Sequence, residues 1–379
     1  MRNRKGILLL TSFALLGALA IRAAPPQRGQ PQGQQEGQSD GKSMNRGIPW
    51  AYGFATPFLA APAPGTGGGA GGRGGAAAAA APAPPAPAPA AELEDRDAPR
   101  HLPGAAAAFA LKEVDNNYGP ADWFPQDHPK MPEIVAHGDK AAMVNACGFC
   151  HYPNGKGRPN NAGPASLPAV YILQQLDDFK TGARTSWDKR KRNTGQMIDI
   201  ARGLTQEEIQ AAAEYFSSMK WTPWIKVIET DMVPKTHFVG GGGGLCMPLA
   251  GAEAGMEPLG DRIVETPASP EDTEPMRNPR SGFIAYVPPG TLKKGEALVL
   301  HGGPGKTVAC AACHGEGLKG NGGFPSLAGR SPSYLARQLY DFQHFTRVGP
   351  GAQLMQPVVE KLSEDDILAI VAYVASLQP

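Results

Sequence analysis

The feature that most constrains this chain is a five-residue motif, Cys-x-x-Cys-His, which occurs twice. The six defining residues of the two copies are Cys147, Cys150, His151, Cys310, Cys313 and His314. In such a motif the two thiols add to the two vinyl groups of a haem, and the histidine one residue later is presented to one face of the iron. The three residues must be close in sequence because the porphyrin edge and the iron are close in space. Each copy therefore predicts one covalently bound haem c, with His151 and His314 as iron ligands.

Two other kinds of site also use a Cys-x-x-Cys pair. A structural zinc site needs a second pair of Cys or His ligands, and neither copy has one at a suitable spacing. A thioredoxin-like redox site needs a strand-helix-strand context, which the glycine-rich segments after His151 and His314 do not resemble. Covalent haem is the better interpretation of both copies.

The motifs belong to a longer internal repeat. A tyrosine follows the first cysteine of each copy by 24 residues, a glutamine comes four residues later, and a methionine lies further on. These matched residues are Tyr171, Gln175 and Met197 in the first copy and Tyr334, Gln338 and Met355 in the second. A repeat of this length predicts two copies of one helical domain. The matched tyrosines and glutamines, together with Arg330, could hydrogen-bond haem propionates or simply pack a helix onto the core.

The methionines are candidates for the second axial ligand of each iron. Of the 11 methionines, only Met197 and Met355 occupy the same place in both copies, ahead of a helix that opens with a capping sequence at Thr205 or Ser363. Core filling is the alternative role, and His344 is a competing ligand in the second copy. An iron with both His and Met ligands has no open position for a substrate, and this ligation raises the reduction potential. The pattern favours a one-electron carrier over an enzyme.

The N-terminal part of the chain accounts for the excess of small residues, 48 Gly and 38 Pro. A basic start followed by an apolar run predicts a secretory signal peptide over residues 1–24, with an uncleaved membrane anchor as the alternative. Residues 25–115, rich in Ala, Pro, Gly and Gln, predict a disordered tether. Its aromatic residues are interpreted as a chance cluster, with a docking segment as the alternative: Trp50, Tyr52, Phe54 and Phe58.

Residues 223–289 have a composition of their own, with nine acidic and five basic residues. Residues 225–230 and 283–288 are predicted to be short strands, and the glycines at 240–244 a turn. We expect an extended inter-domain insert that could form a β-hairpin across both domains. Cys246 lies in it without a haem to bind, so a free buried thiol is expected, with a link to another chain as the alternative.

The overall charge of the chain does not indicate a particular class of binding partner. The net charge of +1 gives no reason to expect nucleic acid as a partner. The one dense basic run, residues 189–192, is either a solvated loop or a rim of the first haem that steers an acidic redox partner.

The second copy in particular resembles a known family, the dihaem cytochromes c of the cytochrome c4 type. The resemblance rests on Cys-Ala-Ala-Cys-His-Gly-Glu-Gly from Cys310, Pro-Ser-Leu-Ala-Gly-Arg from Pro325, Tyr-Leu-Ala-Arg-Gln-Leu from Tyr334, Met355, and Leu-Ser-Glu-Asp-Asp-Ile from Leu362. The first copy matches in its motif, its Tyr171 segment, Met197 and its last helix, but it lacks the Leu-Ala-Gly run and carries the insertion at residues 189–192.

That resemblance implies an all-α protein with two tandem class I cytochrome c domains, at residues 116–222 and 290–379. It implies His/Met ligation by Met197 and Met355, two haem c groups, and electron shuttling in a bacterial periplasm. The expected partners are redox proteins: a membrane dehydrogenase or bc1-type complex as donor, and a terminal oxidase or other acceptor. Two alternatives are a cytochrome subunit of a larger dehydrogenase or oxidase complex, and a dihaem peroxidase-like enzyme, which would need an open iron face.

Overall fold

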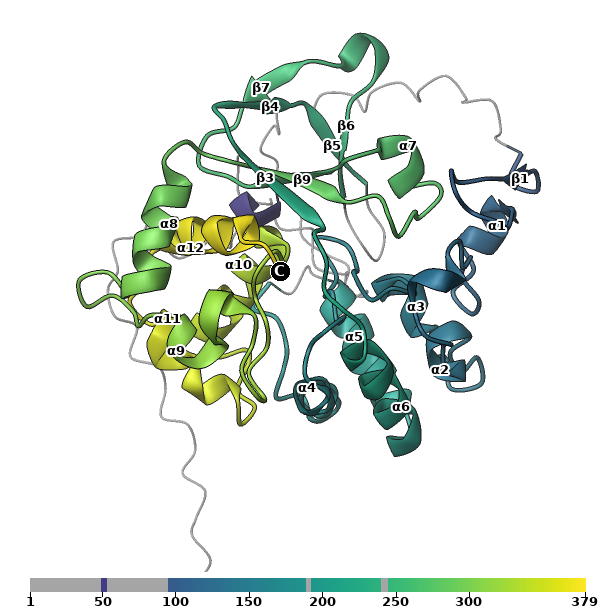
Figure 1. Cartoon of the computed structure of the whole chain (residues 1–379), viewed down its shortest axis with the longest axis horizontal. Coiled ribbons are helices and arrows are strands. Elements are labelled where there is room, and N and C mark those ends of the chain that lie inside the picture. Colours follow the sequence, from purple (N-terminus) through teal and green to yellow (C-terminus); the bar gives the residue numbers. More distant parts are fainter. Residues whose placement is uncertain (1–48, 53–94, 189–191, 240–244) are drawn as a thin grey trace, which may run out of the picture. The chain divides into compact units, whose positions relative to one another are not determined.

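The computed structural model describes residues 49–52, 95–188, 192–239 and 245–379 (Figure 1). The predicted export signal, most of the tether with Phe54 and Phe58, residues 189–191 of the basic run and the glycine turn lie outside the described residues. The described part is largely helical, with several short strands.

The first repeat forms one helical unit around its own core. Its helices are α2 (Glu133–Ala136), α3 (Cys147–His151), α4 (Ala169–Thr181), α5 (Arg192–Gly203) and α6 (Gln206–Ser217). The predicted cap of the last helix is confirmed, because the Thr205 hydroxyl accepts from the Glu208 backbone N–H while the Glu208 carboxylate accepts from the Thr205 N–H. This reciprocal bonding satisfies two of the free donors at a helix start. The helix then buries Ile209, Ala213 and Phe216 against α4.

The second repeat forms a matching unit. Its helices are α8 (Thr291–His301), α9 (Ala311–His314), α10 (Pro332–Gln343), α11 (Gln356–Val359) and α12 (Glu364–Ser376), with 3₁₀ turns η4 (Glu316–Leu318) and η5 (Ala352–Leu354). Ser363 and Asp366 form the predicted capping box of α12. Helices α8 and α12 pack closely because Gly295 has no side chain: a Cβ there would lie 2.0 Å from the Ala369 carbonyl oxygen.

The chain between the two helical units contains a small sheet. Strands β3 (Ile225–Glu229) and β9 (Phe283–Val287) confirm the two predicted strands, and β8 (Val264–Pro267) completes the order β3-β9-β8. The first two pair in parallel, so they do not form a hairpin with each other. Parallel strands need a long crossover connection, which residues 230–282 supply.

That crossover holds the remaining strands. Strands β5 (Thr236–Val239) and β6 (Leu245–Pro248) pair antiparallel, as do β4 (Met232–Pro234) and β7 (Met256–Pro258). The turn η3 (Gly251–Glu253) and the short helix α7 (Pro270–Thr273) complete it.

Part of the predicted tether is folded. Residues 99–115, expected to be disordered, contain β1 (Pro99–Arg100), β2 (Phe109–Ala110) and α1 (Leu111–Val114), followed by the turn η2 (Pro125–Asp127). Leu102, Leu111 and Val114 are buried against Trp123 and, far along the chain, Met276. Composition could not reveal this, because the partner that buries these side chains is distant in sequence.

The short turn η1 (Pro49–Tyr52) also departs from the expected chance cluster. Trp50 is buried, its indole N–H donates to Glu364 Oε2 at 3.1 Å, and its carbonyl accepts from the Ile263 N–H. The Tyr52 carbonyl accepts from Cys246 Sγ at 3.4 Å. Cys246 is buried as expected and forms no disulfide with another cysteine of this chain, and burial raises the pKa of its thiol to about 12.

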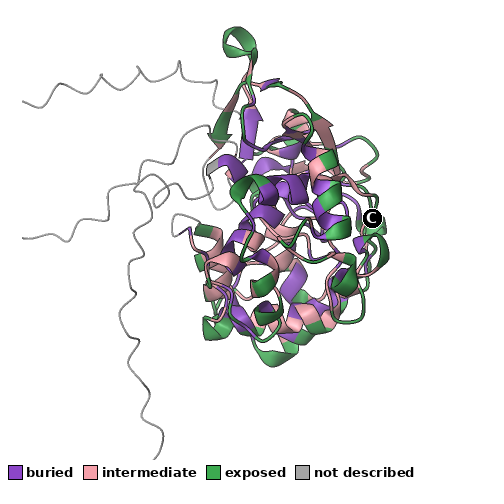
Figure 2. Cartoon of the chain, turned by 90° about the vertical axis from the view of Figure 1, so that its left-hand side faces the viewer, coloured by how far each residue is buried: buried purple, intermediate pink, exposed green. Residues whose placement is uncertain are grey.

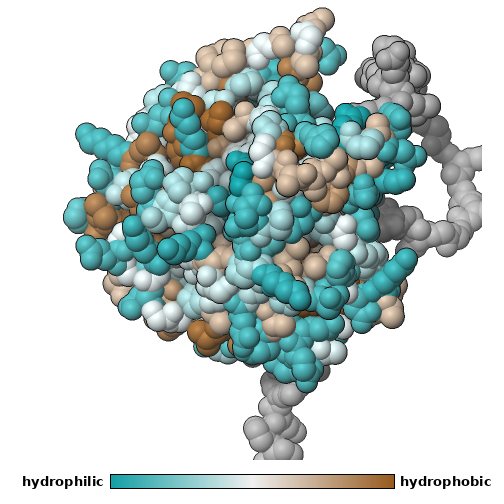
Figure 3. Space-filling view, turned by 45° about the vertical axis from the view of Figure 1, so that its right-hand side comes forward, coloured by the Kyte–Doolittle hydropathy of each residue, from teal (hydrophilic) through white to brown (hydrophobic). Residues whose placement is uncertain are grey.

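Buried residues are concentrated in the helices and strands of the interior, whereas many outer helices and loops are exposed (Figure 2). On the face shown in Figure 3, hydrophilic residues separate small apolar groups. None of the helices in the described ranges has both the length and the apolar composition needed to cross a bilayer.

Candidate functional site

Each Cys-x-x-Cys-His motif lies on one short helix, α3 in the first repeat and α9 in the second. Both helices end in a residue with positive φ, Tyr152 at 62° and Gly315 at 77°. This break stops the helix directly after the histidine, so the following loop can fold back toward the ring.

The two histidines are held in the same way. His151 Nδ1 bonds to the Ala162 carbonyl oxygen at 2.7 Å, and His314 Nδ1 bonds to the Pro325 carbonyl oxygen at 2.8 Å. In both repeats the acceptor lies 11 residues after the histidine. A carbonyl can only accept, so Nδ1 carries the proton and Nε2 keeps its lone pair for a metal. Burial lowers the pKa of both imidazoles, which favours this neutral, ligating form.

The motif cysteines are also in a form that can be linked to haem. All four are free of disulfides. Burial raises the pKa of Cys147 to about 12 and that of Cys310 to about 11. The sites therefore contain protonated thiols beside a correctly oriented imidazole, which fits the chemistry of a covalent haem site.

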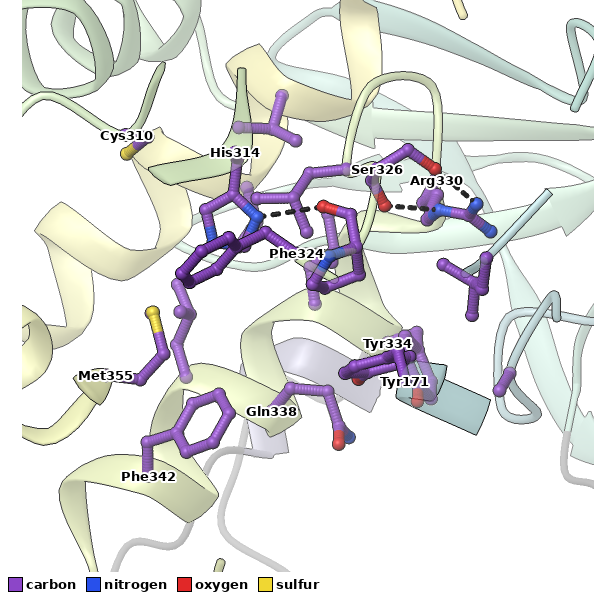
Figure 4. A pocket seen from close by; sticks show the side chains of 18 of the residues that line it. Tyr171, Cys310, His314, Phe324, Ser326, Arg330, Tyr334, Gln338, Phe342 and Met355 are labelled. Carbon is purple, nitrogen blue, oxygen red and sulfur yellow. Dashed lines mark hydrogen bonds between the residues drawn. The ribbon is translucent and has the colours of Figure 1, made fainter. Parts of the chain in front are cut away.

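A cavity of about 430 Å³ lies at the second motif (Figure 4). Its wall includes Cys310, Cys313 and His314, and Met355 from the turn between η5 and α11 also lines it. The rest of the lining is mainly aliphatic and aromatic, as an apolar macrocycle requires, and Phe324 lies beside the imidazole with ring centroids 6.2 Å apart. The structure thus brings the predicted Met355 to the same cavity as His314.

The comparisons with known proteins agree with these sites. The cytochrome c family model matches residues 135–220 and again residues 293–378. A stretch of 75 residues is 37% identical to cytochrome c-554(548) of Halomonas halodenitrificans and covers 90% of that protein but 20% of this chain. This chain belongs to the cytochrome c family. It therefore carries two covalently bound haem c groups, one for each repeat.

Two longer relatives span both repeats of this dihaem cytochrome c. Cytochrome c4 of Pseudomonas aeruginosa is 26% identical over 251 residues, which cover 64% of this chain and 90% of the relative. The thiosulfate dehydrogenase electron acceptor of Stutzerimonas stutzeri is 25% identical over 248 residues, covering 65% of this chain and 85% of the relative. The cytochrome is therefore similar to cytochrome c4 along most of its described length.

The two predicted methionine ligands of the cytochrome lie in different secondary structure. Met355 lies in a turn and lines the cavity, whereas Met197 is half-buried within α5. The competing candidate His344 is stacked on Tyr340, with ring centroids 3.9 Å apart, and bonds to the Tyr340 carbonyl through Nδ1. Its ring takes part in this aromatic contact and is not part of the cavity wall.

Two buried arginines join the repeats of the cytochrome by crossed contacts. Arg184, from the first repeat, donates to Tyr334 OH at 3.0 Å and Gln338 Oε1 at 2.8 Å in the second. Arg347, from the second repeat, donates to Gln175 Oε1 at 2.6 Å in the first. Backbone bonds beside them complete the exchange, from the Thr185 N–H to the Thr346 carbonyl and from the Val348 N–H to the Ala183 carbonyl.

The tyrosines and glutamines of this cluster were predicted from the sequence repeat, but the two arginines were not. A signal was present, because Arg184 and Arg347 each lie 13 residues after the matched tyrosine, Tyr171 or Tyr334. In contrast, Arg330 donates to the Gly163, Ala165 and Ser326 carbonyls. Burial lowers the pKa of Arg330 to about 10, and its bonds hold the loops of the two repeats together.

Proposed function

We propose that this dihaem cytochrome passes single electrons between redox proteins in the bacterial periplasm, with a His/Met pair holding each iron: His151 with Met197, and His314 with Met355. The observation that carries the proposal is the matched orientation of the two histidines by backbone carbonyls. Bound haem c supplies reversible one-electron oxidation and reduction of its iron.

The residues around the second cavity support a carrier more than an enzyme. Val359, Leu362 and Val371 line the cavity and are almost fully buried, which excludes water from the site. Met355 lines the same cavity as His314, which supports its role as the second axial ligand. An iron held by both side chains would have no open position for a substrate. Together with the names of the relatives, this favours electron transfer as the whole activity.

The crossed arginine cluster supports propionate binding between the two sites. The hydrogen bonds from Arg184 and Arg347 that we find among the described residues end on neutral amide and phenol oxygens. Buried cations are stabilised by anions, and a haem propionate is a carboxylate. Tyr171 and Tyr334 line the same cavity as Arg347, so these groups would fix the haem orientation and connect the two sites.

Absorption spectra of the oxidised and reduced protein, with and without carbon monoxide, test the proposal. Two irons with Met ligands should give unchanged spectra when carbon monoxide is added. Strong binding of carbon monoxide by the native protein would contradict the carrier function and favour the peroxidase-like alternative.

Potentiometric titration of Met355→Ala and Met197→Ala tests the two axial ligands. Each variant should show one lowered reduction potential, within the range of about 0.8 V that axial ligands span. Met219→Leu, a buried methionine outside the proposed ligand pair, is the matched control.

A second role is favoured by the relative that is named an electron acceptor of thiosulfate dehydrogenase. By this reading the cytochrome is the electron-accepting subunit of a dehydrogenase complex rather than a free shuttle. Purification from membranes and from the periplasmic fraction separates the two roles. Stable co-purification with an enzyme supports the subunit, and recovery as a single chain supports the shuttle.

A further inference from the structure

The two attachment motifs have the same sequence pattern but very different exposure. Ala311, Ala312 and Cys313 of the second motif are exposed. At the equivalent positions of the first motif, Gly148 is buried, and Phe149 and Cys150 are half-buried. The difference continues past the histidines, since Asn154 is buried while its counterpart Gly317 is exposed.

The cover over the first motif is residues 270–280 of the inter-domain segment, which we call the strap. The Arg277 guanidinium lies 4.1 Å from the centroid of the Phe149 ring and donates to the Phe149 carbonyl. The Asn154 side-chain amide donates to the Pro279 carbonyl at 2.7 Å, and both residues are buried. The strap thus bonds to the motif helix and to the loop that follows it.

The strap is also fixed from its other side. Arg280 forms a double hydrogen bond with the Asp127 carboxylate, at 2.6 and 2.7 Å. The buried Trp123 indole donates to the Met276 carbonyl at 2.7 Å. These contacts attach the strap to the folded segment before the first repeat, and we find no equivalent cover over the second motif among the described residues.

Arg277 has a backbone conformation that non-glycine residues rarely adopt, with φ of 49°. Such a conformation is strained and persists where the surroundings determine it. Here it directs the guanidinium onto Phe149. An ion pair beside it, Arg158 with Glu274 at 3.0 Å, joins the strap to the first repeat once more.

We propose that the strap closes the edge of the first haem to redox proteins, so that partner proteins exchange electrons with this cytochrome at the second motif. The inference rests on the proposed electron-carrier function. Electron tunnelling between proteins falls steeply with distance, and a layer of strap residues over Phe149 and Cys150 keeps a partner from close approach. The second motif has no such layer among the described residues: Val308 and Leu354, which line its cavity, are 52% and 60% exposed.

Hydroxyl-radical footprinting of the haem-loaded protein tests the cover without any electron-transfer assay. Arg277→Ala removes the contact with Phe149, and labelling of Phe149 should rise about threefold. Arg262→Ala is the matched control, because Arg262 is a buried arginine of the same inter-domain segment that bonds instead to Glu257. Equal labelling of Phe149 in all three proteins would overturn the cover.

Stopped-flow oxidation of the reduced cytochrome by a blue-copper protein tests the consequence. A Leu354→Cys variant labelled with a polyethylene-glycol maleimide should lose about tenfold or more in the oxidation rate of both haems. The same label at Ala254→Cys, an exposed position on the inter-domain segment, should leave the rate unchanged. If half of the haem absorbance is still oxidised at the native rate in labelled Leu354→Cys, the first edge is open and the inference fails. Slow oxidation of the unlabelled native protein would instead contradict the carrier function itself.

Discussion

Asp366 shows at the scale of one residue how a buried charge is stabilised in the second repeat. Its carboxylate accepts from Lys306 Nζ at 2.6 Å and Ser363 Oγ at 2.8 Å, and it forms an ion pair with Lys294 Nζ at 2.9 Å. Burial opposes ionisation, but the bonds from the two lysines and the serine outweigh it, so the pKa of Asp366 lies below its ordinary value. The same side chain caps α12, so one charge serves both the ion pairs and the helix start.

Asp366→Asn should lower the free energy of unfolding by about 2–4 kcal/mol at neutral pH, because it removes the charge of a buried carboxylate from its ion pairs with Lys294 and Lys306. A carboxyl with a lowered pKa stabilises the fold above its unfolded pKa of about 4, and that contribution is lost as pH falls toward the folded pKa. The difference in free energy of unfolding between the variant and the native protein should therefore shrink below about pH 4. Urea unfolding at several pH values measures it, and the exposed neighbour in Asp365→Asn should cost under about 1 kcal/mol.

Substitutions of Arg347 test the proposal that the arginine cluster binds haem propionates. A positive charge beside a haem favours the reduced iron, so Arg347→Gln should lower one of the two reduction potentials. Arg347→Lys keeps the charge but loses the planar set of donors, so it should retain most of the potential while lowering the melting temperature. Potentiometric titration and thermal unfolding separate the two effects. Unchanged potentials in Arg347→Gln would show that no haem carboxylate lies near this guanidinium.

At the scale of elements, the turn η1 (Pro49–Tyr52) attaches a distant N-terminal segment to the second repeat. Trp50 and Ala51 are buried beside Ile263, and the Arg337 guanidinium lies 4.9 Å from the Tyr52 ring centroid. A four-residue turn has little stability of its own, so its conformation depends on these contacts. Its release should expose the thiol of Cys246, which the Tyr52 carbonyl covers.

Trp50→Ala should lower the free energy of unfolding by about 2 kcal/mol, less than a central core tryptophan costs because the turn can detach locally. The variant should also speed the reaction of Cys246 with a thiol reagent by about tenfold. Cys246 is the informative thiol, since the other four cysteines are the proposed haem attachment sites. Trp50→Phe, which keeps an aromatic ring, is the control and should react much like the native protein. Equal labelling rates in all three proteins would contradict docking of the turn.

At the scale of the whole molecule, the basic run at residues 189–192 lies close in sequence to contacts with the second repeat. Trp187 donates its backbone N–H to Asp341 and lies with its ring centroid 5.2 Å from that of Tyr340. Arg192, the described member of the run, is exposed at the start of α5. The basic run is therefore preceded by a segment that packs on the second repeat. From the sequence, one interpretation places the run at the rim of the first haem.

Replacing the four basic residues of this run by glutamine should slow electron exchange with an acidic redox protein at low ionic strength. The difference should disappear as salt shortens the Debye length to a few ångströms, at about 1 M. Stopped-flow rates over a salt series measure this. Rates and salt dependence equal to those of the native protein would show that the run is only a solvated loop.

Much of the fold could be read from the sequence because its signals are local. The capping boxes at Thr205 and Ser363, the helices behind them and the strands β3 and β9 depend on residues that are near one another in the chain. The disordered interpretation of residues 99–115 failed for the opposite reason, since Leu102 and Leu111 are buried by a contact set that includes Met276. The parallel pairing of β3 and β9 was missed because it depends on a crossover of about fifty residues.

By itself, the sequence determined the number of haems and predicted the residues that attach them, because covalent attachment requires two thiols and a histidine at fixed short spacing. It also determined that two like domains carry them, because the repeat is in register. Only the tertiary structure decided how the two sites differ. The tautomer of each histidine, the crossed arginines and the strap over Phe149 all depend on groups far apart in the chain, and only folding brings those groups within contact distance.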